Sequence, residues 1–166
     1  MYDLIIIGSG PAGLSAAIAA DKLSLKSALF GIPENSMAWQ IPIVANYPGF
    51  PNPISGEELI KKILEQVKKS DIDLFTEKIV EISNNETNFF LKSEKGKEIS
   101  AKALILAIGS NSEESEKFQE LKEKTGIFLA GDYRENGNFT IAVGEGAKAA
   151  SEANVFIRTI PSLNLP

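Results

Sequence analysis

The 166-residue sequence contains no cysteine and no histidine. Without cysteine, the chain has no disulfide, no thiol nucleophile and no thiolate metal site. Without histidine, it lacks the commonest general base and the commonest metal ligand, so most hydrolytic triads and zinc sites are excluded and no metal site is predicted. If the protein carries out chemistry, we expect a bound cofactor to supply the reactive group.

Excess positive charge and long apolar runs are also missing. Lys and Arg total 17 against 22 Asp and Glu, which gives a net charge of −5 and a pI near 4.9. This balance favours neither nucleic acid nor an anionic membrane as a partner. The apolar run Leu4–Ile7 is too short for a membrane span or a signal peptide, so we expect a cytoplasmic protein. Length and a 43% hydrophobic content predict one domain over residues 1–166.

A glycine motif follows the first apolar run. Gly8, Gly10 and Gly13 form Gly-x-Gly-x-x-Gly between a predicted buried strand and an alanine-rich helix over Leu14–Ala20. In a dinucleotide site, the first glycine permits a tight turn, the second lets a pyrophosphate approach, and the third lets the helix pack on the strand. Amides at the helix start then face the phosphates. We predict dinucleotide binding, with a purely structural glycine turn as the alternative.

The second predicted strand, Ser27–Phe30, completes a βαβ unit but lacks an expected carboxylate. An acidic residue at this strand end usually holds the adenosine ribose, whereas here the strand is followed by Gly31. Glu34 lies beyond the strand and is interpreted as a solvated loop residue, so it is not assigned. No arginine stands at the strand end, so a preference for NADP is not implied.

The remaining pattern alternates between strands and helices. Residues 32–53 contain five prolines and are predicted to form a long loop, which the aromatic residues Trp39, Tyr47 and Phe50 indicate to be ordered and functional. The other expected elements are a helix over Ser55–Lys69 with capping-box spacing, a strand at Asp71–Phe75, three short strands of a meander within Ile79–Ala101, a separate buried strand at Ala103–Ala107, a solvated helix or linker at Ser110–Thr125, a strand at Ile127–Ala130, and a last helix from Phe139 or Thr140 to Ile157. This order predicts an α/β, Rossmann-like, three-layer domain with a central parallel sheet and a small β-meander.

Five sequence blocks carry a family resemblance. They are Gly8–Gly13, Asn46–Pro51 with Ile54–Leu59, Ala103–Gly109, Gly126–Asp132 and Ala142–Ala150. In this order they resemble the FAD-binding domain of thioredoxin reductase and its pyridine nucleotide-disulfide oxidoreductase relatives. In that family an NADPH-binding domain with a redox cysteine pair is inserted between the third and fourth blocks. Here only Ser110–Thr125 separates them, so the resemblance implies an FAD-binding domain without disulfide reductase activity of its own.

The resemblance implies a set of FAD-binding residues. Residues Ser9–Ala12 are expected at the pyrophosphate and Asn46 beside the flavin, while Asp132 is expected at a ribityl hydroxyl or, alternatively, as a turn residue. Amides at the start of the last helix would stabilise negative charge on the reduced flavin. The full set comprises Gly8, Ser9, Gly10, Pro11, Ala12 and Gly13; Phe30, Gly31, Ile32 and Val80 along the adenosine half; Asn46, Asp132, Asn138, Phe139 and Thr140 near the flavin half; and Gln40, Ala107, Gly109 and Gly131 elsewhere in the site.

Some positions depart from the family pattern. Residues 35–37 stand where a glycine-glycine-glutamine stretch normally lies against the flavin, and Ile108 replaces a threonine. Gly137 and Asn138 stand where arginine and glutamine are usual. Trp39 and Tyr47 fit a flavin-stacking role and a plain anchoring role equally well. The charged run 110–124 is interpreted as a solvated face, with partner docking as the alternative.

The expected function is that of a flavin-dependent oxidoreductase or electron-transfer protein. FAD would be bound non-covalently, and a separate reductase protein or a small diffusible reductant would be the electron donor; the acceptor is not identified. The alternative is a non-catalytic FAD-binding module, acting as a subunit, sensor or carrier. No catalytic side chain is assigned. Because the family commonly dimerises through this domain, a homodimer is expected.

Overall fold

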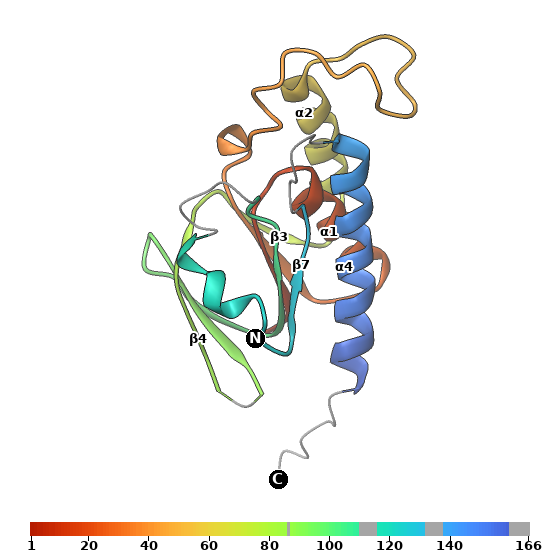
Figure 1. Ribbon diagram of the computed structural model, residues 1–166. Coiled ribbons are helices and arrows are strands. Elements are labelled where there is room, and N and C mark those ends of the chain that lie inside the picture. Colours follow the sequence, from red (N-terminus) through yellow and green to blue (C-terminus); the bar gives the residue numbers. More distant parts are fainter. Residues whose placement is uncertain (86, 110–115, 132–137, 160–166) are drawn as a thin grey trace.

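The computed structural model describes residues 1–85, 87–109, 116–131 and 138–159. Helices cover one face of a central sheet and a β-meander covers the other, as the three layers in Figure 1 show. The strands are β1 (Tyr2–Ile7), β2 (Ser27–Phe30), β3 (Asp73–Phe75), β4 (Ile79–Asn84), β5 (Phe89–Ser93), β6 (Glu98–Leu106) and β7 (Ile127–Leu129). The helices are α1 (Pro11–Lys22), α2 (Gly56–Val67) and α4 (Phe139–Thr159), with short 3-10 turns η1 (Pro33–Asn35) and η2 (Gln119–Leu121).

Five strands form the parallel part of the sheet, in the order β3-β2-β1-β6-β7. Strand β1 lies near the centre because both of its faces are apolar. Leu4 and Ile6 pack under the helices, while Ile5 and Ile7 pack under the meander. All four are essentially buried. Continuous aliphatic runs are typical of parallel strands covered on both faces, and the predicted Rossmann-like α/β fold is confirmed.

Strand β6 belongs to both the meander and the parallel sheet. Its first half pairs antiparallel with β5, and its second half pairs parallel with β7, on the same edge. The sequence predicted two strands here, one ending at Ala101 and one starting at Ala103, and this prediction is wrong. The strand is partly exposed at its start and fully buried over Ala103–Leu106. The change in hydrophobic pattern therefore marks the point where the neighbouring strand changes from β5 to β7, and not a break in the strand.

Helices α1 and α4 pack closely through small side chains. A Cβ on Gly146 of α4 would stand 2.0 Å from the Ala12 carbonyl oxygen of α1, so only glycine permits this approach. The Ser15 hydroxyl donates a 2.7 Å hydrogen bond to the Val143 carbonyl and fixes the register of the two helices. The start of α4 is thereby held beside the start of α1.

The long loop between β2 and α2 is ordered by a few contacts. Val44 and Ile54 form an antiparallel bridge, and the Gly56 amide donates to the Ile41 carbonyl at 2.8 Å. The Ser55 side chain accepts from the Glu58 amide at 3.1 Å and caps α2, as its spacing predicted. The loop also contains η1, a short regular turn that the proline-rich pattern did not predict.

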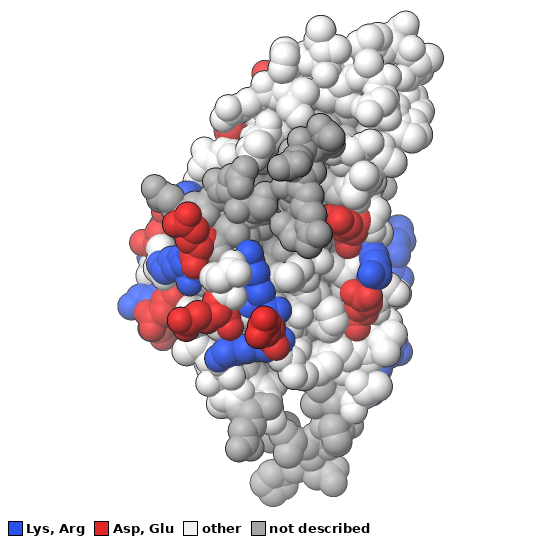
Figure 2. Space-filling model, viewed as in Figure 1, with Lys and Arg blue, Asp and Glu red and all other residues white. Residues whose placement is uncertain are grey.

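Charge is distributed unevenly over the surface. Residues 35–56 contain no Asp, Glu, Lys or Arg, and Figure 2 shows the corresponding end of the molecule as almost free of charge, whereas acidic and basic side chains crowd the meander and α4. Within the described ranges, no helix is long and apolar enough to cross a membrane.

Candidate functional site

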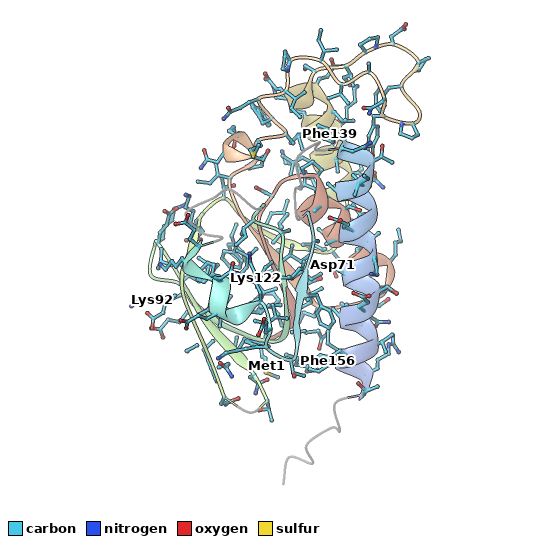
Figure 3. All side chains as sticks on the ribbon, in the orientation of Figure 1. Met1, Asp71, Lys92, Lys122, Phe139 and Phe156 are labelled. Atoms are coloured by element: carbon cyan, nitrogen blue, oxygen red, sulfur yellow. The ribbon has the colours of Figure 1, made fainter. Side chains whose placement is uncertain are left out.

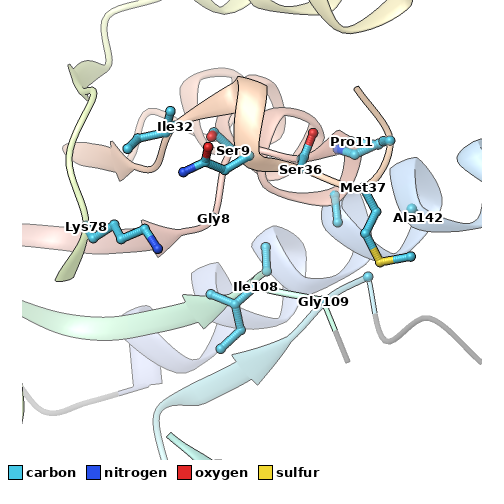
Figure 4. A pocket seen from close by; sticks show the side chains of 16 residues that line it. Gly8, Ser9, Pro11, Ile32, Ser36, Met37, Lys78, Ile108, Gly109 and Ala142 are labelled. Atoms are coloured by element: carbon cyan, nitrogen blue, oxygen red, sulfur yellow. The ribbon is translucent and has the colours of Figure 1, made fainter. Parts of the chain in front are cut away.

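A cavity of about 340 Å³ lies where the parallel strands end at their carboxyl edge. This is the edge at which open α/β sheets bind ligands, and the volume falls in the range of about 300–1,000 Å³ of small-molecule sites. Figure 4 shows Ser9 in the middle of the cavity, Ile32 and Lys78 toward one end, and Met37 and Ala142 toward the other. The cavity is lined by Gly8, Ser9, Gly10, Pro11, Ala12, Ile32, Asn35, Ser36, Met37, Ala38, Lys78, Ala107, Ile108, Gly109, Gly131 and Ala142.

The three glycines of the first turn meet different surroundings. A Cβ on Gly8 would lie 2.3 Å from the Ala107 oxygen, and one on Gly13 would lie 1.8 Å from the Gly8 oxygen, so packing of the protein itself requires both glycines. A Cβ on Gly10 has one neighbour within 4 Å among the described residues, the Ser36 Cβ at 3.6 Å. The space above Gly10 therefore belongs to the cavity. This supports the dinucleotide interpretation over a purely structural turn.

The start of α1 offers hydrogen-bond donors to this space. Gly10 is the N-cap and Pro11 follows it; in the described structure no side chain caps the helix and no acidic residue stands in its first turn. First-turn amides and the positive end of the helix dipole both favour an anion at such a place. The Ser9 hydroxyl oxygen is also buried and has no hydrogen-bond partner among the described residues. The donor set fits a pyrophosphate.

Lys78 brings a cationic side chain to the cavity. It follows β3 and is the only charged residue in the lining formed by the described parts of the chain. In Figure 4 its side chain extends toward Gly8. A lysine and a helix N-terminus at the same cavity both favour an anionic ligand there.

The residues predicted along an adenosine half are only partly in the cavity. Ile32 lines the cavity. Gly31 packs against Ser9, because a Cβ on Gly31 would stand 2.6 Å from the Ser9 hydroxyl oxygen. Phe30 is instead buried in the core under the meander, with its ring stacked on that of Phe75 at 4.5 Å. Val80 lies in β4, where the pairing with β5 skips a residue, and its carbonyl accepts a hydrogen bond from Lys117.

The residues predicted near a flavin lie around the start of α4. Asn138 caps this helix, because its side-chain oxygen accepts from the Thr140 amide at 2.8 Å. Phe139 is buried and contacts the Tyr47 ring edge-on at 6.1 Å between centroids. This contact brings the loop that carries Asn46 to the N-terminal end of α4, the end where Figure 3 labels Phe139. Asn46 and Gln40 are exposed and do not line the cavity.

The end of β7 completes the wall of the cavity. The Gly131 amide donates a 2.8 Å hydrogen bond to the Glu145 carboxylate of α4, and a Cβ on Gly131 would stand 2.9 Å from the Ala12 Cβ. Three segments distant in sequence therefore meet at Gly131. Ala107 and Gly109 lie beside it in the lining. Asp132 and Gly137 fall outside the described residues.

Several lining residues were not among the predicted binding residues. Residues 35–37 and Ile108 could have been expected at the cavity, because the sequence departs from the family pattern at these positions, which lie near the cofactor in the family. Ala142 lies one helical turn after Phe139, so its position could have been inferred from α4 alone. No local sequence motif includes Lys78. It lies at the cavity because it follows β3, which pairs in parallel with β2.

Comparison with known proteins identifies the relatives. A profile of the pyridine nucleotide-disulphide oxidoreductase family matches residues 2–129. Thioredoxin reductase of Peptoclostridium acidaminophilum is 38% identical over 113 residues, covering 66% of this chain and 35% of that protein. Thioredoxin reductase of Aquifex aeolicus is 34% identical over 127 residues, covering 76% of this chain and 39% of that protein. The chain thus spans little more than a third of the length of these relatives.

Solved structures agree with this assignment. Thioredoxin reductase from Streptococcus pyogenes has 33% identity and a TM-score of 0.59 over 66% of this chain and 35% of that chain. Lactococcus lactis thioredoxin reductase has a TM-score of 0.78 over 95% of this chain and 99% of that chain, and its 18% identity shows the shared fold alone. Between Gly109 and Gly126 this sequence contains neither an NADPH-binding domain nor a cysteine pair. The chain belongs to the pyridine nucleotide-disulphide oxidoreductase family and corresponds to the FAD-binding part of thioredoxin reductases.

Proposed function

We propose that this chain is a flavoprotein that binds FAD non-covalently in the cavity and takes electrons from a separate donor. The observation that carries the proposal is the open space above Gly10. It is bordered by the start of α1, which no side chain caps, and by the Ser9 hydroxyl, which has no partner within the described residues. Membership of the family supports FAD over other dinucleotides. When bound, FAD would accept and release electrons at its flavin ring.

Residues of this chain would bind and orient the cofactor. Backbone amides of Ser9, Gly10, Ala12 and Gly13, together with the Ser9 hydroxyl, would hold the pyrophosphate, and Lys78 would offset its negative charge. The adenosine half would extend past Ile32, and the flavin half toward Met37 and Ala142, along the axis visible in Figure 4. The N-terminal end of α4 would favour negative charge near the flavin.

The separate donor follows from what this sequence lacks. No second glycine fingerprint follows Gly109, so efficient oxidation of NADPH by these residues alone is not expected. Disulfide reduction through a cysteine pair is excluded for this chain because it contains no cysteine. We propose a donor outside residues 1–166, either another protein or a small diffusible reductant.

Reconstitution tests the proposal. The purified chain is expected to be yellow, or to become so when its cofactor-free form takes up FAD, with quenched flavin fluorescence and a raised Tm. Binding raises the free energy of unfolding by about 2.7 kcal/mol at a hundredfold excess of ligand over Kd. A folded chain that takes up no FAD at micromolar concentrations would refute the proposal.

One observation favours the alternative of a non-catalytic module. Apart from Lys78, the described lining offers no charged side chain that could act as an acid or base. Anaerobic mixing of the FAD-bound chain with NADH, NADPH, dithionite and reduced ferredoxin separates the two candidates. Rapid reduction by a biological donor, followed by reoxidation by an acceptor, supports the electron-transfer protein; reduction by dithionite alone supports the module.

The oligomeric state and the location belong to the same proposal. We expect a homodimer in the cytoplasm, as the resemblance implied. The uncharged surface of residues 35–56 is a suitable contact region for a second copy, because charged residues are depleted at interface centres. Sedimentation equilibrium measures this directly, and a species of one-chain mass at all concentrations would contradict the dimer.

A further inference from the structure

The end of β2 cannot hold the carboxylate that Rossmann folds usually place there. Its position is occupied by Gly31, and a Cβ at Gly31 would stand 2.6 Å from the Ser9 hydroxyl oxygen and 2.7 Å from the Ser9 nitrogen. Any side chain at this position would therefore collide with the phosphate-binding turn. An acidic acceptor for the adenosine ribose would therefore come from another segment of the chain.

The Glu77 carboxylate is buried, and one of its two oxygens has no hydrogen-bond partner in the described parts of the chain. The residue is 5% exposed, and its Oε2 atom is buried with no hydrogen bond among the described residues. A buried carboxylate oxygen that has lost water and gained no donor costs free energy. Such a group in a native protein calls for a ligand or another explanation.

The sheet register places Glu77 beside the end of β2. Phe75 of β3 pairs with Phe30 of β2, and the Gly31 amide donates to the Phe75 carbonyl at 3.1 Å. The segments that follow β2 and β3 therefore leave the sheet side by side. In the sequence, Ile32 follows Gly31 and Lys78 follows Glu77. Ile32 and Lys78 both line the same end of the cavity, as Figure 4 shows.

We propose that the Glu77 carboxylate accepts the hydrogen bonds of the adenosine ribose hydroxyls, in place of an acid at the end of β2. The inference rests on the proposed binding of FAD and names the residue that recognises its adenosine half. Glu34 is the competing candidate along the chain. Neither carboxylate is in the lining of the cavity, but Glu77 directly precedes the lining residue Lys78. Glu34 is exposed on η1, whereas Glu77 is buried and its Oε2 atom has no partner among the described residues, so the buried residue is favoured.

Two ligands and two variants test this assignment. The Kd values of FAD and of an FAD analogue lacking the 2′ and 3′ hydroxyls of the adenosine ribose are measured for the cofactor-free wild type, Glu77→Gln and the matched control Glu34→Gln. We expect Glu77→Gln to weaken FAD about tenfold, as is typical for a lost hydrogen bond to a charged group, and to leave the analogue unchanged. Glu34→Gln should bind both ligands as the wild type does.

Stability of the cofactor-free protein provides an independent readout. Because Oε2 has no partner in the part of the chain that the structure describes, Glu77→Gln and Glu77→Met should unfold at a temperature equal to or above that of the wild type. Glu77→Met also covers the case in which the glutamine variant folds poorly. A carboxylate with a purely structural role would instead give a lower Tm in both variants and unchanged discrimination between the two ligands, which would overturn the inference.

The outcomes separate this inference from the proposed function. A wild type that fails to bind FAD refutes the proposed function itself. A wild type that binds FAD but does not distinguish it from the analogue refutes the role of Glu77 alone. Loss of discrimination in Glu34→Gln in place of Glu77→Gln would move the assignment to η1.

Discussion

At the residue scale, the glycine turn separates positions needed for folding from a position kept open for a ligand. Gly8 and Gly13 are fixed by contacts of 2.3 and 1.8 Å that a Cβ would make with backbone oxygens. Among the described residues, a Cβ on Gly10 would meet only the Ser36 Cβ, at 3.6 Å, which agrees with the separate role that the motif gives its second glycine. The distinction is testable because alanine adds only the one atom in question.

We expect Gly10→Ala to fold normally and to bind FAD at least tenfold more weakly, because its methyl group occupies the space for the pyrophosphate. Gly13→Ala should instead lose several kcal/mol of stability, since α1 must move away from β1. Thermal unfolding of the cofactor-free proteins and fluorescence titration with FAD measure both effects. Equal affinities of Gly10→Ala and wild type would show that the phosphates lie elsewhere.

At the scale of elements, the segment before β7 is anchored more firmly than its sequence suggests. The charged run was interpreted as a solvated helix or linker. In its described part, Phe118 is 3% exposed and packs in the core under the meander, close to η2. Lys124 reaches Asn84 at 2.7 Å and Lys117 reaches the Val80 carbonyl, so the segment is fastened to β4 as well.

Removing the Phe118 ring should detach this segment. Phe118→Ala is expected to cost about 3–5 kcal/mol, as is usual for a buried phenylalanine. It should also accelerate cleavage by trypsin near Lys117, Lys122 and Lys124. Gln119→Ala, at the exposed neighbouring position, is the matched control and should unfold and digest like the wild type. Denaturant unfolding and limited proteolysis followed by mass spectrometry give the two readouts.

The alternating elements were predictable from sequence because each depends on local pattern. The aliphatic run of β1, the glycine turn and the cap of α2 at Ser55 all appear where their spacing placed them. The unbroken course of β6 was not predictable, since its two halves are distinguished only by partners elsewhere in the chain. The burial of Phe118 and of Glu77 likewise depends on tertiary packing, which no local pattern in a charged segment reveals.

At the scale of the whole molecule, one side-chain contact joins two non-adjacent strands of the sheet and should affect stability in alkali. The Tyr2 hydroxyl of β1 donates to the Asp73 carboxylate of β3 at 2.7 Å, across the intervening β2. Burial, and then the hydrogen bond and charge of Asp73, raise the pKa of Tyr2 from 10.0 to about 12. The folded protein therefore keeps this proton at pH values where the unfolded chain has lost it.

The stabilisation by Tyr2 is consequently full below pH 10 and is lost as the pH rises from 10 to about 12. We expect the Tm of the wild type to fall more steeply over this range than that of Tyr2→Phe, which has no titrating group at this position. At neutral pH, Tyr2→Phe should cost about 1 kcal/mol, the usual value of one hydrogen bond. Parallel Tm profiles of the two proteins above pH 10 would contradict the assignment.

The shared strand β6 has a consequence for synthesis on the ribosome. Strand β1 is made before β6, its neighbour on one side, which is completed only at Leu106. Until then the nascent chain exposes an aliphatic strand edge that can pair with other polypeptides. Early protection by a chaperone, or early docking of α1 onto β1, would therefore determine how much of the newly made protein escapes aggregation.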